Sequence, residues 1–277
     1  MKHAAIAAAV TLLAAGSVLA DWDDDCKYTA PRNLTTPAAG VTKVVIHAES
    51  GSLRVDGIAG ATQVGVTGTA CTSDDEFLDR IRLTARRQGS ELHIESDIPD
   101  RTVFFGFFQA RLDFAVTLPA GLPVTIDDGS GWIKVSNTGA LLIDDDSGSI
   151  ELRNIRGNVE IDDDSGEIDI DGVNGDVRIS DDSGSITVKN VTGHVEIEDD
   201  SGSISVARVA SLRIRNDDSG SISVQNVRGD VLIDEDGSGS IDVADIGGNF
   251  TVEHKGSGGI DYTGVKGKVR IPERHRR

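Results

Sequence analysis

Acidic residues recur along the second half of the chain in runs that directly precede a Ser-Gly pair. Asp144-Asp145-Asp146 and Asp162-Asp163-Asp164 are two of these runs. Carboxylates repeated at a fixed interval supply the hard oxygen ligands that Ca²⁺ takes. Asp162-x-Asp164-x-Gly166 has the alternating spacing of a calcium loop, although the distal Glu that completes such a loop is missing. The candidate calcium ligands are Asp145, Asp146, Asp163, Asp164, Asp181, Asp182, Asp199, Asp200, Asp217 and Asp218.

The same runs have a simpler interpretation as solvated turns. Each Asp can accept hydrogen bonds from the Gly and Ser amides that follow it, with the remaining charge facing water. Equivalent carboxylates stacked about 5 Å apart repel one another by roughly 1 kcal/mol in water, so solvent or a cation must offset that repulsion. No Lys or Arg occupies these turns until Lys255, where the acids disappear as well. The sequence leaves both interpretations open.

The acidic runs belong to a tandem repeat that extends from Ser130 to Ile271. Its signature is Ser-Gly-Ser-Ile or a close variant, which recurs every 18 residues, with an interval of 17 at the start and of 19 at the end. Repeats of this length indicate stacked supersecondary units, none of which can bury its own apolar side alone. The eight units begin at Ser130, Ser147, Ser165, Ser183, Ser201, Ser219, Ser238 and Ser257.

Apolar residues, nearly all Val and Ile, occupy positions four, six, nine, thirteen and fifteen of each unit. The alternation at four and six, and again at thirteen and fifteen, predicts two short strands per unit. Asn or Gly at position eight and Gly at position eleven predict turns with positive φ. One unit is out of phase, because Leu212 and Ile214 fall one place early. The pattern predicts an all-β fold, a right-handed parallel β-helix (β-solenoid) of about 18-residue coils.

These units resemble the bacterial "putative adhesin" family of β-strand-repeat proteins of unknown function. The resemblance rests on Ser-Gly-Ser-Ile-x-Val followed by Gly-x-Val-x-Ile, on an early coil at residues 49–55, and on a strand at residues 114–119. It covers residues 41–271. The resemblance implies an extracytoplasmic right-handed β-helix without established catalysis, and it transfers no binding residues.

Residues 1–20 have the pattern of a cleaved signal peptide, with Lys2, a short apolar run and a small-residue site ending at Ala20. The apolar run is too short to span a bilayer, and we expect no transmembrane segment in the mature chain. We therefore expect export to the periplasm, the medium or the cell surface. An oxidising compartment would pair the two cysteines, Cys26 and Cys71, as a structural disulfide.

Residues 21–129 are less regular and are expected to form N-terminal strands and an irregular β cap, because an open solenoid end exposes unpaired strand edges. Phe104, Phe105, Phe107 and Phe108 either pack over that end or form an aromatic loop that contacts a partner. Residues 130–271 form the solenoid repeats, and residues 272–277 form a basic, solvated tail.

The formal charge of −19 argues against nucleic acid as a partner, since nucleic acids are bound by clustered Lys and Arg. A catalytic site needs unlike groups that break the repeat, and here the acids recur almost identically, so we expect no enzyme. We expect a structural or adhesin-like binding scaffold in the cell envelope, whose partner is an unknown envelope protein or polysaccharide. The alternatives are a calcium-binding repeat protein, with Ca²⁺ as its only possible cofactor, and a polysaccharide-active β-helix enzyme.

Overall fold

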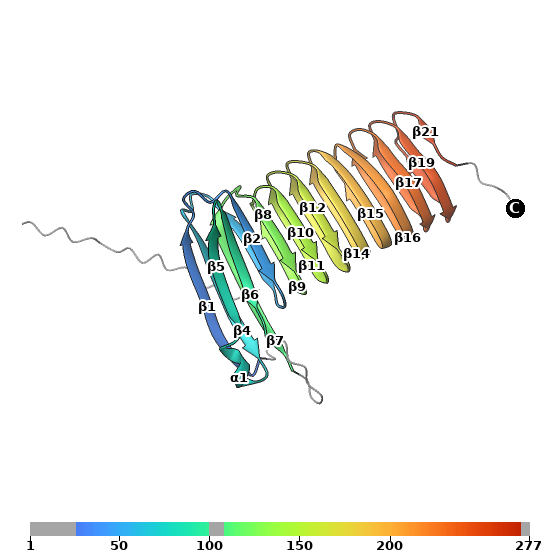
Figure 1. The fold of residues 1–277 in the computed structure, drawn as a ribbon. Helices are drawn as coiled ribbons and strands as arrows, with labels where there is room; N and C mark the ends of the chain where they lie inside the picture. The colour runs from blue at the N-terminus through green and yellow to red at the C-terminus, as the bar shows by residue number, and fades with distance from the viewer. Residues whose placement is uncertain (1–25, 100–107, 273–277) are drawn as a thin grey trace, which may run out of the picture.

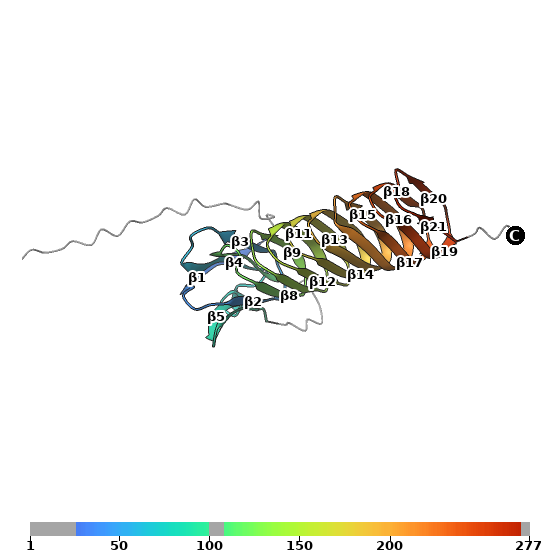
Figure 2. The ribbon, with the colours of Figure 1, turned by 90° about the horizontal axis from the view of Figure 1, so that it is seen from above.

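The computed structural model describes residues 26–99 and 108–272. The signal peptide, the tail from residue 273, Phe104, Phe105 and Phe107 lie outside these residues. The described chain is a β-solenoid in which two parallel stacks of strands face each other (Figures 1 and 2). The solenoid and its approximately 18-residue coils agree with the fold expected from the repeat.

The first sheet holds the strands that follow each Ser-Gly pair, and the second sheet holds the strands that precede it. The first sheet contains β9 (Gly131–Ser136), β11 (Gly148–Ile155), β13 (Gly166–Val173), β18 (Ile241–Ile246) and β20 (Ile260–Thr263). The second contains β8 (Val124–Asp128), β10 (Leu141–Asp145), β12 (Val159–Asp163), β17 (Val231–Ser238), β19 (Phe250–Ser257) and β21 (Val269–Arg270). Three longer strands turn the Ser-Gly corner and join both sheets, namely β14 (Val177–Val191), β15 (His194–Ala207) and β16 (Ser211–Val227).

The core lies between the two sheets and is built from the predicted apolar positions. In one coil Ile186, Val188 and Val191 are at most 1% exposed, and Val195 and Ile197 are fully buried. Each of these residues stacks on its equivalent in the next coil, so the core is a set of continuous Val and Ile columns. Branched side chains suit this arrangement because they pack well on a pleated surface.

The residue types at turn positions eight and eleven have two different structural causes, and only the cause at position eight matches the expectation. Position eight has positive φ, as predicted, for example at Asn154 (57°) and Asn190 (59°). The prediction for position eleven was wrong in general, since Gly175 and Gly193 do not have positive φ. At position eleven a side chain would collide with the backbone of the preceding coil, so close stacking demands the glycine there.

The coil that is out of phase is restored by a β-bulge. Ile197 pairs with Ile214, but Glu198 pairs with Asn216, so Arg215 is the extra residue on β16. A bulge adds one residue to one strand and leaves the ladder beyond it intact. The acidic run after Arg215 therefore returns to the register of the other coils.

The parallel stacks continue into the N-terminal region, past the start of the repeat. In the second sheet β2 (Lys43–Ala48) pairs with β8 and with β6 (Glu91–Asp97). In the first sheet β3 (Leu53–Ile58) pairs with β9 and with β7 (Ala110–Pro119). The coil formed by β2 and β3 thus lies between β6–β7 and the repeats, although it precedes both in the sequence.

Antiparallel strands cover the N-terminal end of the solenoid (Figure 1). These are β1 (Tyr28–Pro37), β4 (Gln63–Thr72) and β5 (Arg82–Gln88), and a short helix α1 (Asp75–Leu78) follows β4. Cys26 and Cys71 form the predicted disulfide and tie the chain before β1 to β4. Phe108 packs edge-on against Phe77, with ring centroids 4.9 Å apart. The antiparallel strands cover the strand edges that an open solenoid end would expose.

The Ser-Gly corner provides a test of the stacking. Gly184 has φ of +148°, and a Cβ atom on it would overlap the carbonyl oxygen of Gly166 in the preceding coil. We expect Gly184→Ala to lower the free energy of unfolding by about 2–4 kcal/mol, through strained backbone and overpacking. Urea unfolding followed by circular dichroism measures the change.

Gly259→Ala is the matched control, because a Cβ atom there meets nothing within 4 Å and its φ is not positive. We expect the control to change stability by less than about 0.5 kcal/mol. Equal effects of the two substitutions would contradict close stacking at the Ser-Gly corner.

Candidate functional site

The alternation of buried residues in the second sheet continues one step beyond the apolar positions, into the acidic run. In β12, Val159, Ile161 and Asp163 all point inward, while Glu160 and Asp162 are exposed. One Asp of every run is therefore buried at the Ser-Gly corner, and none of these residues is more than 3% exposed. We call this set the Asp column: Asp128, Asp145, Asp163, Asp181, Asp199, Asp217 and Asp236.

The strand register places the members of the Asp column directly on top of one another. Asp145 pairs with Asp128 on one side and with Asp163 on the other, and the same pairing repeats in every later coil. Strands in a sheet lie about 4.8 Å apart, so successive carboxylates have that spacing along the corner. Ala48 continues the column at its N-terminal end, and Lys255 continues it at its C-terminal end.

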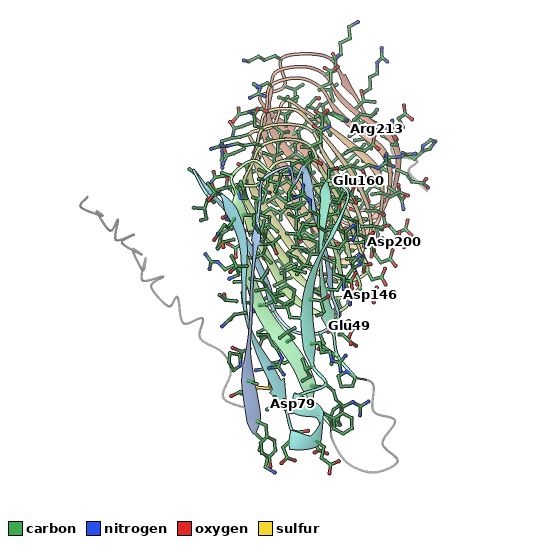
Figure 3. The ribbon with its side chains drawn as sticks, turned by 60° about the vertical axis from the view of Figure 1, so that its left-hand side comes forward. Glu49, Asp79, Asp146, Glu160, Asp200 and Arg213 are labelled. Carbon is green, nitrogen blue, oxygen red and sulfur yellow. A yellow bond between two sulfur atoms is a disulfide. The ribbon has the colours of Figure 1, made fainter. Side chains whose placement is uncertain are left out.

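The expectation that the acidic runs form one water-facing edge was wrong for the inward residues. Strand alternation divides the ten candidate calcium ligands into two rows. Asp145, Asp163, Asp181, Asp199 and Asp217 are buried, whereas Asp146, Asp164, Asp182, Asp200 and Asp218 are exposed. Figure 3 shows Asp146 and Asp200 along the outer edge of the rod. Among residues 26–99 and 108–272, no three carboxylates, imidazoles or thiolates converge on a point where a metal ion could be held.

The column carboxylates are only partly hydrogen-bonded. The Ser147 amide donates to Asp145 Oδ1 at 3.3 Å, and the Ser183 amide donates to Asp181 Oδ1 at 3.1 Å. These bonds match the turn capping expected from the sequence. The second oxygen of each of these carboxylates is buried and has no partner, and Asp199 and Asp217 have no hydrogen-bond partner on either oxygen. Buried polar atoms are normally satisfied, so this row of unpartnered oxygens is unusual.

Burial and mutual repulsion raise the pKa values of the column. Loss of solvation is the main cause at Asp163, where it raises the pKa to about 7, and neighbouring Asp145 and Asp181 add to the effect. The same causes raise the pKa of Asp199 to about 7. At Asp181 burial raises the pKa to about 6, while the hydrogen bond from the Ser183 amide opposes the shift. Near neutral pH the column is therefore only partly ionised.

Lys255 ends the column and supplies its only internal cation among the described residues. The Lys255 side chain is 6% exposed, and its Nζ lies 3.1 Å from Asp236 Oδ2. The ammonium also donates to the carbonyl oxygen of Gly239 at 3.0 Å and to that of Ser257. It lowers the pKa of Asp236 against the larger, raising effect of burial.

The outward faces of both sheets carry ion pairs, and on the first sheet Arg153 Nη2 pairs with Asp169 Oδ2 and Lys134 Nζ lies 3.3 Å from Glu151 Oε2. The second sheet carries ion pairs, such as Arg213 Nη2 with Asp234 Oδ2 at 2.7 Å and Arg178 Nη1 with Glu196 Oε1 at 3.6 Å. Beside its ion pairs, the first sheet has an uncharged region over three coils, which we call the hydroxyl strip. Its members stack in two rows and are Ser185, Ser203, Ser221, Thr187, Ser205 and Ser223.

A family comparison agrees with this fold and with the expected relationship. Residues 66–255 match the model of the family described as Toastrack DUF4097. The match covers more than half of the chain, and the chain belongs to this family. No curated protein matches the chain.

Two solved structures from Parabacteroides distasonis share the fold. One is described as a "putative adhesin", with a TM-score of 0.51, 13% identity, and coverage of 88% of this chain and 97% of its own. The other is described as a "Putative lipid binding protein", with a TM-score of 0.52, 14% identity, and coverage of 89% and 98%. At these identities the likeness concerns the fold alone.

The sequence analysis missed Asp128, Asp236 and Lys255 as parts of one feature. For Asp128 the signal was present in the strand pattern Val-x-Ile-x-Asp, in which the Asp occupies the next inward position after two apolar ones. Asp236 and Lys255 lie one place further along, because their strands keep the extra residue of the bulged coil. The acidic runs were expected to lie in solvated turns or to bind Ca²⁺, and ionised carboxylates are rarely buried without a partner.

The raised pKa values predict that stability falls as pH rises. A carboxyl with a pKa of about 3.9 when unfolded and about 6 to 7 when folded favours the folded state while it is protonated. This stabilisation is complete below the unfolded pKa and is lost as the pH passes through the folded values. We therefore expect the melting temperature in low-salt buffer to decrease from pH 5 to pH 8, as measured by differential scanning calorimetry.

Asp181→Asn tests whether the column causes this decrease. The substitution removes one buried charge, so we expect it to raise the melting temperature at pH 8 and to change it little at pH 5. Asp182→Asn removes the same charge from the exposed neighbour and should leave the pH profile unchanged. A wild-type melting temperature that is constant or increases between pH 5 and pH 8 would show that the column does not govern the profile.

Proposed function

We propose that this protein is an exported, non-catalytic binding scaffold of the cell envelope, which presents the hydroxyl strip to an envelope protein or polysaccharide. The observation that carries the proposal is the strip itself, an uncharged region of hydroxyl side chains on a chain with a formal charge of −19. The family and the fold are consistent with a scaffold, and the strip is the surface that we propose for binding.

The physical argument concerns the cost of binding on each face. A partner that covers the second sheet must desolvate ion pairs such as Arg213 with Asp234. A partner on the hydroxyl strip covers small side chains that lose little rotamer freedom and can each donate and accept a hydrogen bond. Their regular spacing along and across the strands suits a polar, extended ligand such as a glycan or a peptide strand.

The contacts within the described residues support a role without catalysis. One contact resembles the nucleophile–base pair of a hydrolase, because His194 Nδ1 lies 2.9 Å from Ser211 Oγ on the second sheet. The nearby Asp176 Oδ1 accepts from the backbone amide of His194 rather than from its ring. The ring therefore lacks the orienting carboxylate that a catalytic triad requires. We propose a structural role for this pair.

Ser205→Arg tests the binding face. An Arg in the middle of the strip places a long charged side chain where the partner would lie, so we expect at least a tenfold loss of binding to envelope fractions of the source organism. Co-sedimentation with isolated envelopes, followed by quantification of bound protein, measures the loss.

Ser180→Arg is the matched control, because Ser180 lies on the outward face of the second sheet and stacks between Asp162 and Glu198. It should bind like the wild type. Circular dichroism would confirm that both variants are folded. Equal binding by the two variants would contradict the assignment of the hydroxyl strip, and loss of binding by Ser180→Arg alone would place the contact on the opposite sheet.

Export predicts a processed N-terminus. If residues 1–20 are a signal peptide, protein recovered from the extracytoplasmic fraction begins at Asp21 and carries the Cys26–Cys71 disulfide. Intact mass spectrometry with and without reductant measures both features. Recovery of the full-length chain in the cytoplasmic fraction alone would contradict export.

A further inference from the structure

The Asp column contains more negative charge than its surroundings compensate. Seven carboxylates are stacked in one buried corner, and Lys255 is the single cationic side chain that continues the column. Their spacing of about 4.8 Å makes each ionised neighbour repulsive, and the repulsion grows as the local dielectric constant falls. Each of the seven carboxylates has at least one buried oxygen without a hydrogen-bond partner. A cation that enters the corner would find carboxylate oxygens already in place as ligands.

Lys255 shows what the corner offers to a cation. Its ammonium lies between two coils, with three oxygen atoms as its polar partners, namely a carboxylate oxygen of Asp236 and the carbonyl oxygens of Gly239 and Ser257. Gly239 belongs to the coil of Asp236, and Ser257 follows Lys255 in the next coil. The ligands are therefore one carboxylate and one carbonyl from the first coil, and one carbonyl from the second.

The same oxygen atoms recur between every pair of coils. The Gly239 carbonyl points at Gly258 of the following coil, and the carbonyls of Gly148, Gly166 and Gly184 point at the following glycine in the same way. Ser147, Ser165 and Ser183 occupy the positions equivalent to Ser257. In these coils an Asp takes the place of the lysine, so each step has two carboxylates and no ammonium.

The number of charges agrees with this comparison. Seven column residues define six steps between successive Asp residues, and the step from Asp236 to Lys255 is the seventh. One unit positive charge at each of the seven steps balances the seven carboxylates. Lys255 supplies that charge at the last step, which leaves six steps to be neutralised from solvent.

We propose that the six steps between Asp128 and Asp236 bind alkali-metal cations, Na⁺ or K⁺, one per step, at positions equivalent to the Lys255 ammonium. Two successive carboxylates, a Gly carbonyl and a Ser carbonyl form the ligand set of each step. These are hard oxygen ligands, which suit alkali and alkaline-earth cations. A singly charged ion at every step leaves the column neutral, whereas Ca²⁺ achieves neutrality only at alternate steps.

Thermal melting at pH 8 and constant ionic strength tests the proposal. The wild-type protein is compared in NaCl, KCl and tetramethylammonium chloride, the last of which is too large to enter the corner. We expect the alkali chlorides to raise the melting temperature above that in tetramethylammonium chloride by roughly 5 °C or more at saturation. Equal melting temperatures in the three salts would overturn the proposal and would indicate that protonation alone neutralises the Asp column.

The variants assign the effect to the column. Asp181→Asn with Asp199→Asn alters three of the six steps and should halve the alkali-specific shift, whereas Asp182→Asn with Asp200→Asn removes the same charge outside and should retain it. A rise in melting temperature that only Ca²⁺ produces, and that EDTA reverses, would overturn the monovalent assignment.

Crystals of the wild-type protein grown in RbCl provide a readout independent of the variants, because Rb⁺ scatters anomalously. Anomalous density between successive carboxylates would support the proposal, and its absence from the column would refute it.

Discussion

The parallel ladder of this solenoid brings every residue of a coil to within about 4.8 Å of its own equivalent in the next coil. Columns of Val and Ile are stable under this constraint, because identical branched side chains pack well on one another. The glycines of the Ser-Gly corner follow from the same constraint, since a side chain there would overlap the carbonyl of the preceding coil. The constraint also stacks like charges, and it does so inside the fold at the Asp column.

The Asp column consequently opposes the stability of the rod. Burial raises the pKa values of its carboxyls, which lowers the charge without removing it. The fold ends the column with Ala48 on one side and with Lys255 on the other. The Lys255 ammonium donates to two backbone carbonyls in addition to its ion pair with Asp236, so backbone oxygens as well as a carboxylate surround this charge.

The two outer faces have different chemistry although the same repeat builds both. Ion pairs cross the coils on the second sheet, where Arg and Glu or Asp alternate along a row. On the first sheet small hydroxyl residues occupy the corresponding rows over three coils. The rod can meet a partner at this uncharged region at a low cost in desolvation, while its other sides remain hydrated.

The sequence alone determined the coil length, the strand positions, the core residues and the disulfide, because a strict period with Val and Ile at fixed positions permits few folds. It did not reveal that Asp145 and its equivalents are buried. The acidic run contains inward and outward residues of the same type, and only the strand register decides which carboxylate faces the core. The position of Lys255 over Asp236 likewise depended on the tertiary structure, since a bulge at Arg215 and two longer coils lie between Asp199 and Lys255. The N-terminal coil order, with β2 between β6 and β8, was also decided by packing, because strands distant in sequence can complete the same sheet.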